Sequence, residues 1–461
     1  MAGATANVIV PPSATTSARR RPRVGTLVLL VVLGCIVVRG AVALTVYEAD
    51  PHVATQADSP TYLEPALALL DHGRFSESAN DRQPEFLRTP GYPAFIALVY
   101  LVAGHHVVAL LLAQVLLGAA TVLVLFALGR RMGSDAVGLL AAALLVFEPL
   151  QLYTTGSVLT ESLATLLLAL VALFGFIVFA APAPTRRVAF LLGLALAVAT
   201  LVRPVMYYLP LVVVAFVAST VVRRRTTWRD ACRVLAALLV PLVVLVGGWQ
   251  LRNHEAVGSW RVSGIEGKNL YLFRAAEIVA AREHTHLAVA QARLLAELGP
   301  LGSTRQGPYY ERMYRRGLAI VEGHPLLAVE DALGGLVDEV TSARSRFFAY
   351  IGLRDPPPLL GDLATLLLVA LYAFAVVGVV AVVRARRDLL GHAFVLAVAV
   401  YVLVASAGPE AFAGRGERFR AVIMPIVVLY AARGIVDVVA RRRSLGLTED
   451  DARTSLPTRS G

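Results

Sequence analysis

Long apolar stretches recur along this chain and are separated by short polar links. A helix needs about 20 predominantly apolar residues to cross a lipid bilayer. Ten candidate stretches cover residues 24–46, 106–128, 136–153, 159–181, 188–201, 205–222, 234–251, 359–383, 391–407 and 421–439. The pattern therefore predicts an all-α polytopic membrane protein with about ten transmembrane helices.

Arginine clusters beside these stretches orient the predicted helices, because cytoplasmic loops of membrane proteins collect positive charge. With the N-terminus inside, the clusters at 130–131, 186–187, 223–225, 384–387 and 441–443 all fall on the cytoplasmic side. Both termini are then cytoplasmic, with residues 1–23 as a disordered tail and residues 441–461 as a second tail. A twin-arginine export signal near residue 20 is the rival interpretation, but the apolar stretch that follows is long enough to span the membrane.

The same orientation leaves two long segments outside. Residues 47–105 form a first outer loop within an N-terminal transmembrane module of residues 24–251. Residues 252–358 form an extracytoplasmic domain ahead of the C-terminal transmembrane helices of residues 359–440. Glycine and serine positions predict extended chain over 258–273, and apolar periodicity predicts helices over 274–298 and 309–321.

Composition supports a membrane protein and argues against a nucleic-acid partner. The chain is 57% hydrophobic and 16% charged, whereas soluble domains carry about 25% charged residues. The formal charge of +11 comes from clusters beside apolar stretches, which membrane orientation explains. Cys35 and Cys232 lie in or beside apolar stretches, so they predict neither a disulfide nor a metal site.

Several arginines lie on the side of the membrane where positive charge is disfavoured. They are Arg88, Arg203, Arg252, Arg415, Arg418 and Arg420. A guanidinium group binds phosphate oxygens in a bidentate manner and does not lose its charge, so outward-facing arginines suit an anionic lipid headgroup. Acidic residues join them at the same face, namely Asp58, Glu85, Glu148 and Glu161. Carboxylates and arginines at one membrane face indicate a functional site.

Structural alternatives stay open for these residues. Asp58 also fits the N-cap of a helix that begins near residue 60. Arg88 and Arg252 also fit side chains that reach along a helix end to lipid phosphate. Glu161 also fits an acidic residue that complements a helix N-terminus, and residues 415–420 fit a loop with internal ion pairs.

An ordered set of residues in the first outer loop carries a resemblance to a known family. Asp58 is followed by Tyr62, Ala66, Leu69 and Gly73, and then by Arg88-Thr89-Pro90-Gly91-Tyr92-Pro93. This order and spacing resemble the aspartate, juxtamembrane helix and proline-rich turn of the polyprenyl-phosphate-dependent glycosyltransferases of the GT-C class, in the branch of the protein O-mannosyltransferases and the lipid A aminoarabinose transferases. Further matching positions are Thr160-Glu161, Arg203-Pro204, Trp249, Arg252-Asn253 and Arg418-Phe419-Arg420.

Two departures from the family pattern concern the substrate. Many relatives carry an Asp-Glu pair in the first outer loop, whereas Asp58 is followed here by Ser59. The turn reads Arg-Thr-Pro-Gly-Tyr-Pro instead of the Lys-Pro-Pro form common in aminoarabinose transferases. The second departure argues against aminoarabinose as the sugar.

The resemblance implies a GT-C-like membrane glycosyltransferase that moves a sugar from a polyprenyl-phosphate donor to an acceptor hydroxyl on the extracytoplasmic side, with inversion. Such a transfer needs a base for the acceptor and cations for the departing phosphate. We expect Asp58 to be the catalytic base. We expect the donor phosphate to be bound by Arg203, Arg418 and Arg420, and the acceptor or the sugar to be contacted by Arg88, Tyr92, Glu161, Asn253 and Lys268.

The expected partners are the lipid-linked donor, the bilayer, and a glycan, lipid or protein acceptor, with no nucleic acid. No pattern predicts a metal site, and a divalent cation stays an open question, as does the choice between a hexose and a pentose. The alternative function is that of a lipid or sugar transporter or flippase. Transporters place polar residues near the bilayer midplane between repeated halves, whereas here the polar residues gather at one face and no repeat is visible, which favours the enzyme.

Overall fold

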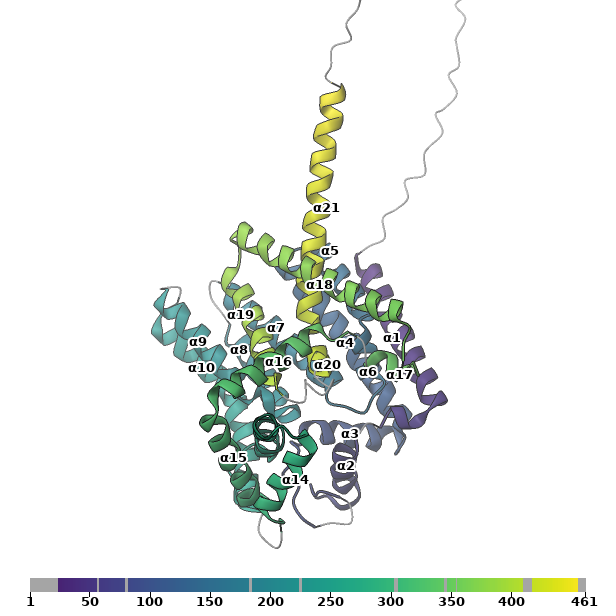
Figure 1. Cartoon of the computed structure of the whole chain (residues 1–461). Helices are drawn as coiled ribbons and strands as arrows, with labels where there is room; N and C mark the ends of the chain where they lie inside the picture. Colours follow the sequence, from purple (N-terminus) through teal and green to yellow (C-terminus); the bar gives the residue numbers. More distant parts are fainter. Residues whose placement is uncertain are drawn as a thin grey trace, which may run out of the picture.

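The protein is almost entirely helical in the part of the chain that the computed structural model describes (Figure 1). That part comprises residues 24–55, 58–78, 82–181, 185–223, 226–301, 306–343, 346–353, 355–408 and 417–454. Within it, an isolated bridge between Ser76 and Pro84 is the one β pairing. The prediction of an all-α protein is confirmed.

Eight helical stretches of the described chain are long and apolar enough to cross a membrane. They are α1 (Val24–Ala49), α4 (Val107–Met132), α7 (Glu161–Ala180), η2 with α9 (Pro204–Val222), α10 through α11 (Trp228–Val257), α18 (Pro358–Ala385), α19 (Leu389–Ser406), and α20 (Glu417–Arg420) continuing into α21 (Met424–Thr454). A ninth span forms if α5 (Asp135–Val146) and α6 (Pro149–Thr155), which are bent by 59°, cross together. The remaining predicted stretch, residues 188–201, forms α8 (Arg186–Val202), which has only 17 residues. A count of ten spans is therefore not confirmed.

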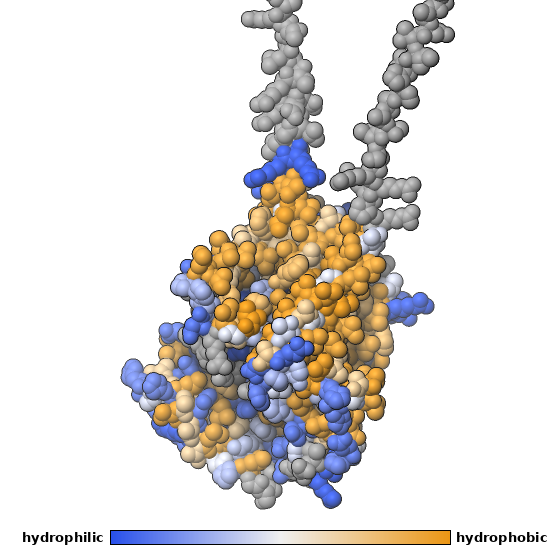
Figure 2. Space-filling model, turned by 90° about the vertical axis from the view of Figure 1, so that its right-hand side faces the viewer, coloured by the Kyte–Doolittle hydropathy of each residue, from blue (hydrophilic) through white to orange (hydrophobic). Residues whose placement is uncertain are grey.

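The apolar helices pack into one bundle around α4 and α7. α4 contacts α1, α5 and α7, while α21 contacts α5 and α18. Gly378 of α18 lies directly against the backbone of Tyr430, and Gly434 of α21 lies against Phe374. Small residues allow such close crossings, which stabilise helix pairs by van der Waals contact where lipid supplies no hydrophobic driving force. Figure 2 shows hydrophobic residues over the upper part of one face and hydrophilic residues toward its lower end.

A buried arginine donates hydrogen bonds to groups in both helices at the bend between α5 and α6. Arg39 of α1 is 2% exposed, and its Nη2 donates to the carbonyl of Leu145 at 2.6 Å. Its Nη1 donates to the hydroxyl of Thr155 at 3.4 Å. A broken helix is stable in a membrane when neighbouring groups re-satisfy its free backbone atoms in this way.

The first long loop, residues 47–105, carries α2 (Pro60–His72) and α3 (Gly91–Ala103). The guanidinium group of Arg252 fastens this loop to the end of α11. It donates to the carbonyl oxygens of Phe75 at 2.9 Å and Glu85 at 2.7 Å. Arg252 is therefore a link between two segments of the protein and not a side chain that reaches into lipid.

The second long segment folds into short helices with a small core of their own. They are α12 (Ile265–Asn269), α13 (Ala276–Glu283), α14 (Leu287–Leu298), α15 (Gln306–Gly323), α16 (Pro325–Thr341) and α17 (Arg346–Tyr350), and a π-helical turn (Leu270–Ala275) joins α12 to α13. The prediction of extended chain over 258–273 is wrong from Ile265 onward. The predicted helix over 274–298 is interrupted at His284, whose φ of 52° ends α13.

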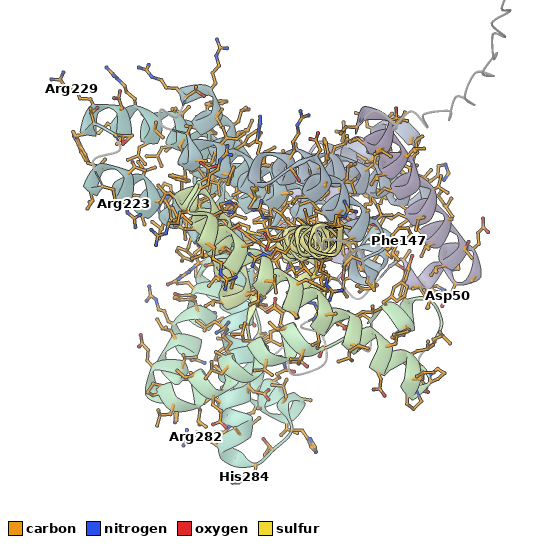
Figure 3. The ribbon with its side chains drawn as sticks, turned by 90° about the horizontal axis from the view of Figure 1, so that it is seen from above. Asp50, Phe147, Arg223, Arg229, Arg282 and His284 are labelled. Carbon is orange, nitrogen blue, oxygen red and sulfur yellow. The ribbon has the colours of Figure 1, made fainter. Side chains whose placement is uncertain are left out.

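The helices of the second long segment, such as α14 and α15, lie at one end of the bundle. Figure 1 shows the start of α1 and the far end of α21 at the opposite end from α14 and α15. In Figure 3, Arg223 and Arg229 project from the tips of α9 and α10, while Arg282 and His284 lie at a separate tip. Part of the predicted C-terminal tail is helical, because α21 continues through Thr454, and the predicted N-terminal tail (1–23) and residues 455–461 lie outside the described residues.

Candidate functional site

Asp58 lies in the turn before α2 and faces two arginine side chains. Ser59 is the N-cap of α2, so Asp58 is not the capping residue that the sequence left open. Oδ1 of Asp58 lies 3.1 Å from Nη2 of Arg88, and Oδ2 lies 3.0 Å from Nη1 of Arg418. The Ser59 hydroxyl donates to the carbonyl of Val158 at 2.9 Å, which holds this turn against the segment that leads into α7.

Burial and ion pairing act on the Asp58 carboxyl in opposite directions. Burial raises its pKa, but the guanidinium groups of Arg418 and Arg88 lower it by more, so the pKa lies below its ordinary value of 3.8. The carboxylate is therefore ionised at neutral pH. It is a weak base as long as both arginines stay beside it.

Several contacts hold Arg88 in place. Its Nε donates to Oγ1 of Thr61 at 2.9 Å, and its guanidinium carbon lies 4.5 Å from the centroid of the Tyr62 ring. Its backbone N–H donates to Oε1 of Glu85 at 2.7 Å. Arg88 therefore fixes the position of Asp58.

The turn that carries Arg88 touches the end of α8 at Gly91. A Cβ atom on Gly91 would lie 2.6 Å from the carbonyl oxygen of Leu201, where ordinary contacts begin at 3.4 Å. Only glycine lets the two backbones approach this closely. Two residues after Leu201, α8 ends at Arg203, because Pro204 cannot continue the helix. This contact sets where Arg88 and Arg203 lie relative to each other.

Glu161 is the first residue of α7 and is almost fully buried, with 1% of its side chain exposed. Its Oε1 lies 3.0 Å from Nη1 of Arg203 and 3.0 Å from Nε of Arg418. Both guanidinium groups also lie near the ring of Phe419, at 5.4 Å and 5.2 Å from its centroid. The buried carboxylate thus holds the two arginines side by side.

These contacts form a row of alternating charge from Arg88 through Asp58, Arg418 and Glu161 to Arg203. The members come from the first long loop, α20, α7 and the end of α8. Asp58 and Arg418 are separated by 360 residues in sequence. The structure therefore brings together the acid and the two arginines to which the sequence assigned the central roles.

A cavity of about 910 Å³, here named the charged cavity, opens on this row. Among the described residues that line it, six basic side chains face two acidic ones, which gives a formal charge of +4. The basic residues are Arg88, Arg203, Lys268, Arg274, Arg346 and Arg418, and the acidic residues are Asp58 and Glu266. Most of the other residues that line the cavity are apolar or aromatic, so it suits a ligand with an anionic group and an apolar part.

Four residues predicted for the site lie outside the lining of the charged cavity, namely Arg420, Tyr92, Asn253 and Glu161, of which Glu161 still contacts the lining residues Arg203 and Arg418. Arg420, predicted to bind phosphate, is buried and its Nη1 donates to the carbonyls of Glu339 at 2.7 Å and Val340 at 3.0 Å. Tyr92 is buried and donates to Gln114 at 2.9 Å. Both side chains make contacts between helices in this structure, and neither lines the charged cavity.

Asn253 also lies outside this lining, and its Nδ2 donates to the carbonyls of Arg261 at 2.9 Å and Val262 at 3.1 Å. It therefore shapes the loop after α11 from a fully buried position. Lys268 lines the charged cavity. Arg415 lies outside the described residues. Among the residues that are described, no three His, Cys, Asp or Glu side chains are grouped closely enough to hold a metal ion.

Sequence reasoning missed several charged residues that the structure places near the site. Arg274, Arg346 and Glu266 line the charged cavity, but in sequence they look like ordinary polar positions of a surface helix or loop. Arg39, which lies at the bend between α5 and α6, could have been recognised as a buried residue from the sequence, because an arginine within an apolar span is rare and faces the bundle interior.

Comparison with known proteins supports a glycosyltransferase fold. Residues 87–249 match the family described as dolichyl-phosphate-mannose-protein mannosyltransferase. No curated protein matches the chain by sequence. The oligosaccharyltransferase AglB of Archaeoglobus fulgidus, solved with an inhibitory peptide and a dolichol-phosphate, is 11% identical at a TM-score of 0.52. The alignment covers 93% of this chain and 52% of AglB, so this chain spans about half the length of that protein.

A second AglB structure, tethered to an acceptor peptide, gives the same identity, coverage and TM-score. ArnT of Cupriavidus metallidurans, solved with undecaprenyl phosphate, is 17% identical over 92% of this chain and 81% of ArnT, at a TM-score of 0.37. The resemblance in the first long loop had predicted a GT-C-like fold. The similarity to AglB and the matching family segment confirm that the chain has the GT-C glycosyltransferase fold.

Proposed function

We propose that this protein is a membrane glycosyltransferase that moves a sugar from a polyprenyl-phosphate donor to a hydroxyl group of an acceptor. The row of alternating charge, four of whose five members line the charged cavity, carries the proposal. A polyprenyl-phosphate sugar has one negative charge, and its phosphate gains a second when the bond to the sugar breaks. Arginines that are already in place stabilise that developing charge.

The proposed reaction is a single displacement. Arg203 and Arg418 bind the donor phosphate, and Asp58 takes the proton of the acceptor hydroxyl. The acceptor oxygen attacks the anomeric carbon on the side opposite the phosphate. The bond from that carbon to the phosphate oxygen breaks, its electron pair leaves with the polyprenyl phosphate, and the configuration of the sugar inverts.

Arg418 couples donor binding to the strength of the base. It is shared between Asp58 and Glu161 at 3.0 Å each. When Arg418 turns toward the donor phosphate, Asp58 loses one of the two cations that lower its pKa. Asp58 then becomes a stronger base only when a donor is present, while Glu161 keeps Arg203 and Arg418 aligned.

The arginine distribution supports an extracytoplasmic site. Arg130 and Arg131 end α4, Arg384 is in the last turn of α18, and Arg441 lies along α21. Under the rule that positive charge collects in the cytoplasm, these helix ends and both termini are cytoplasmic. The charged cavity is at the helix ends that face away from them, where a lipid-linked sugar is reached from the outer leaflet.

The comparisons guide the choice of substrates. The name of the matching family includes dolichyl-phosphate mannose, and the AglB title includes dolichol-phosphate. Polyprenyl-phosphate mannose is therefore the first donor to test, together with polyprenyl phosphates that carry other hexoses or pentoses. A flippase is disfavoured, because a transporter would have its charged residues near the membrane midplane between repeated halves, whereas those of this protein gather at the helix ends.

Purified protein in nanodiscs, incubated with a panel of polyprenyl-phosphate sugars, tests the proposal. We expect one donor to be hydrolysed or transferred, and we expect Asp58→Asn to abolish transfer without weakening donor binding. Asp71→Asn is the matched control, since Asp71 lies in the same loop with an exposed side chain. Full transfer by Asp58→Asn, or the absence of reaction with every donor, would contradict the proposal.

A further inference from the structure

A second cavity of about 520 Å³ lies beside the charged cavity. Here named the aromatic cavity, it lies between η2 (Pro204–Tyr208), α11 (Gly248–Val257), residues 258–262, α12 and α15. Tyr208 and Glu266 line both cavities. A ligand in the aromatic cavity therefore lies next to whatever occupies the charged cavity.

Flat aromatic rings form the apolar surface of this cavity. Trp260 is 57% exposed, and its ring stacks on His254 with 4.3 Å between centroids and 14° between planes. One face of the indole is thus covered, and the exposed area belongs to the other face and the edge. Tyr207 and Tyr208 pack edge to face at 4.9 Å, and Tyr208 is 50% exposed.

The polar groups around these rings are ones that bind hydroxyl groups. Gln250 lines the cavity and donates to the carbonyl of Trp260 at 2.8 Å, which fixes the amide beside the ring. The carboxylates of Glu266 and Glu311 line the same cavity. An aromatic face binds the weakly positive C–H face of a sugar ring, while carboxylates and amides accept and donate hydrogen bonds at its hydroxyls.

The charge of the aromatic cavity excludes an anionic ligand. Among its described lining residues, one arginine faces two glutamates, a formal charge of −1, against +4 for the charged cavity. Arg261 is already engaged, because its Nε lies 2.7 Å from Glu311 and its Nη1 lies 3.2 Å from Glu266. A phosphate group would meet two carboxylates here and no uncommitted cation.

Two side chains in contact, Arg261 and Tyr314, lie where the two cavities meet. The guanidinium carbon of Arg261 lies 3.6 Å from the centroid of the Tyr314 ring. Tyr314 lines the charged cavity, and Arg261 lines the aromatic one. A ligand in the aromatic cavity thus adjoins the space assigned to the donor, with which it shares the lining residues Tyr208 and Glu266.

We propose that the aromatic cavity binds the acceptor and that the acceptor is a neutral saccharide. The proposal rests on the function proposed above for the charged cavity, because it names the second substrate of the same transfer. The neighbouring cavities then divide the substrates by charge, with the anionic donor beside the arginines and the uncharged acceptor beside the aromatic rings.

Saturation-transfer NMR on the full-length protein in nanodiscs tests this assignment. The probes are neutral trisaccharides (mannotriose, maltotriose, galactotriose and arabinotriose), a Ser/Thr-rich peptide and mannose 6-phosphate. We expect at least one neutral trisaccharide to bind, and we expect Trp260→Ala to weaken its binding roughly tenfold. Trp260→Phe, which keeps an aromatic face, and Trp228→Ala, a 69% exposed tryptophan on α10, should bind within about twofold of the wild type.

The other outcomes overturn the assignment. It is wrong if no trisaccharide binds at 10 mM, if Trp260→Ala binds as the wild type does, or if only the peptide or the phosphorylated sugar binds in a Trp260-dependent manner. Donor hydrolysis measured on the same samples separates the two proposals. Hydrolysis without saccharide binding removes the acceptor assignment alone, whereas Trp260-dependent saccharide binding without hydrolysis of any donor removes the transferase and leaves a saccharide site.

Discussion

Gly91→Ala tests whether the contact between the first long loop and α8 sets the geometry of the site. The new Cβ would lie 2.6 Å from the carbonyl oxygen of Leu201 and 2.8 Å from a methyl group of Val202. An ordinary contact of 3.4 Å requires the two backbones to separate by about 0.8 Å, and overpacking of this kind costs about 1–3 kcal/mol. The shift moves Arg88 away from Arg203, and a misplacement near 1 Å lowers catalysis by up to about 100-fold.

The assay compares donor turnover with thermal unfolding for Gly91→Ala and for Gly34→Ala. Gly34 lies in α1, where an added Cβ meets no atom within 4 Å, so it reports the general effect of replacing a helical glycine. We expect Gly91→Ala to lower kcat/KM by about 10-fold to 100-fold per folded molecule, and Gly34→Ala to leave it unchanged. Equal turnover in the two variants would refute the reasoning, because the close contact would then have no influence on the reacting groups.

Further predictions concern the phosphate site, a titrating carboxyl and the buried arginine. Arg418→Gln should lower kcat/KM for the donor, measured by steady-state kinetics, by about 10²–10³-fold, and Arg418→Lys should have an intermediate effect. A loss of less than about threefold for Arg418→Gln would contradict a phosphate-binding role. Burial raises the pKa of Glu85 from 4.5 to about 7, so the folded state retains a proton that the unfolded state releases, and stability falls as pH rises from 4.5 to about 7. Glu85→Gln should therefore stabilise the protein at pH 8 by up to about 3 kcal/mol more than at pH 5 in chemical unfolding, and an equal effect at both pH values would contradict this. Arg39→Met removes the hydrogen bonds that Arg39 donates to the carbonyl of Leu145 and the hydroxyl of Thr155 and should cost about 1–3 kcal/mol of stability in the same assay. An unchanged unfolding curve would remove the role assigned to Arg39 at the bend.

The sequence predicted the membrane fold well because its signals are local. Long apolar stretches and the arginine clusters beside them identify the spans without knowledge of their contacts. The count of spans was less secure, because the Glu148-Pro149 break bends one stretch and α8 is short. Extended chain was predicted over 258–273 from glycine and serine positions, but packing of α12 against α15 overrides that local preference.

The candidate site residues that stood out in the sequence were exceptions to the rule that positive charge collects on the cytoplasmic side. Asp58, Arg203 and Arg418 stood out as charges at a membrane face that usually lacks them, and the structure brings them together. Arg420 stood out by the same signal, yet it lies on the other side of α20 from Arg418, because residues two apart on a helix point in nearly opposite directions. Tyr92 contacts Gln114, which lies on another helix and could not be identified as its partner from the sequence. Asn253 contacts the loop after α11, whose conformation no sequence pattern predicts.

The central claim is that Arg203 and Arg418 bind the phosphate of a lipid donor and that Asp58 acts beside them. A cryo-electron microscopy structure of the protein in nanodiscs with undecaprenyl phosphate tests it directly. The account predicts the phosphate in the charged cavity, within hydrogen-bonding distance of both arginines, with the contact between Arg418 and Asp58 opened from its present 3.0 Å. A phosphate bound elsewhere, with both ion pairs of Asp58 intact, would contradict it.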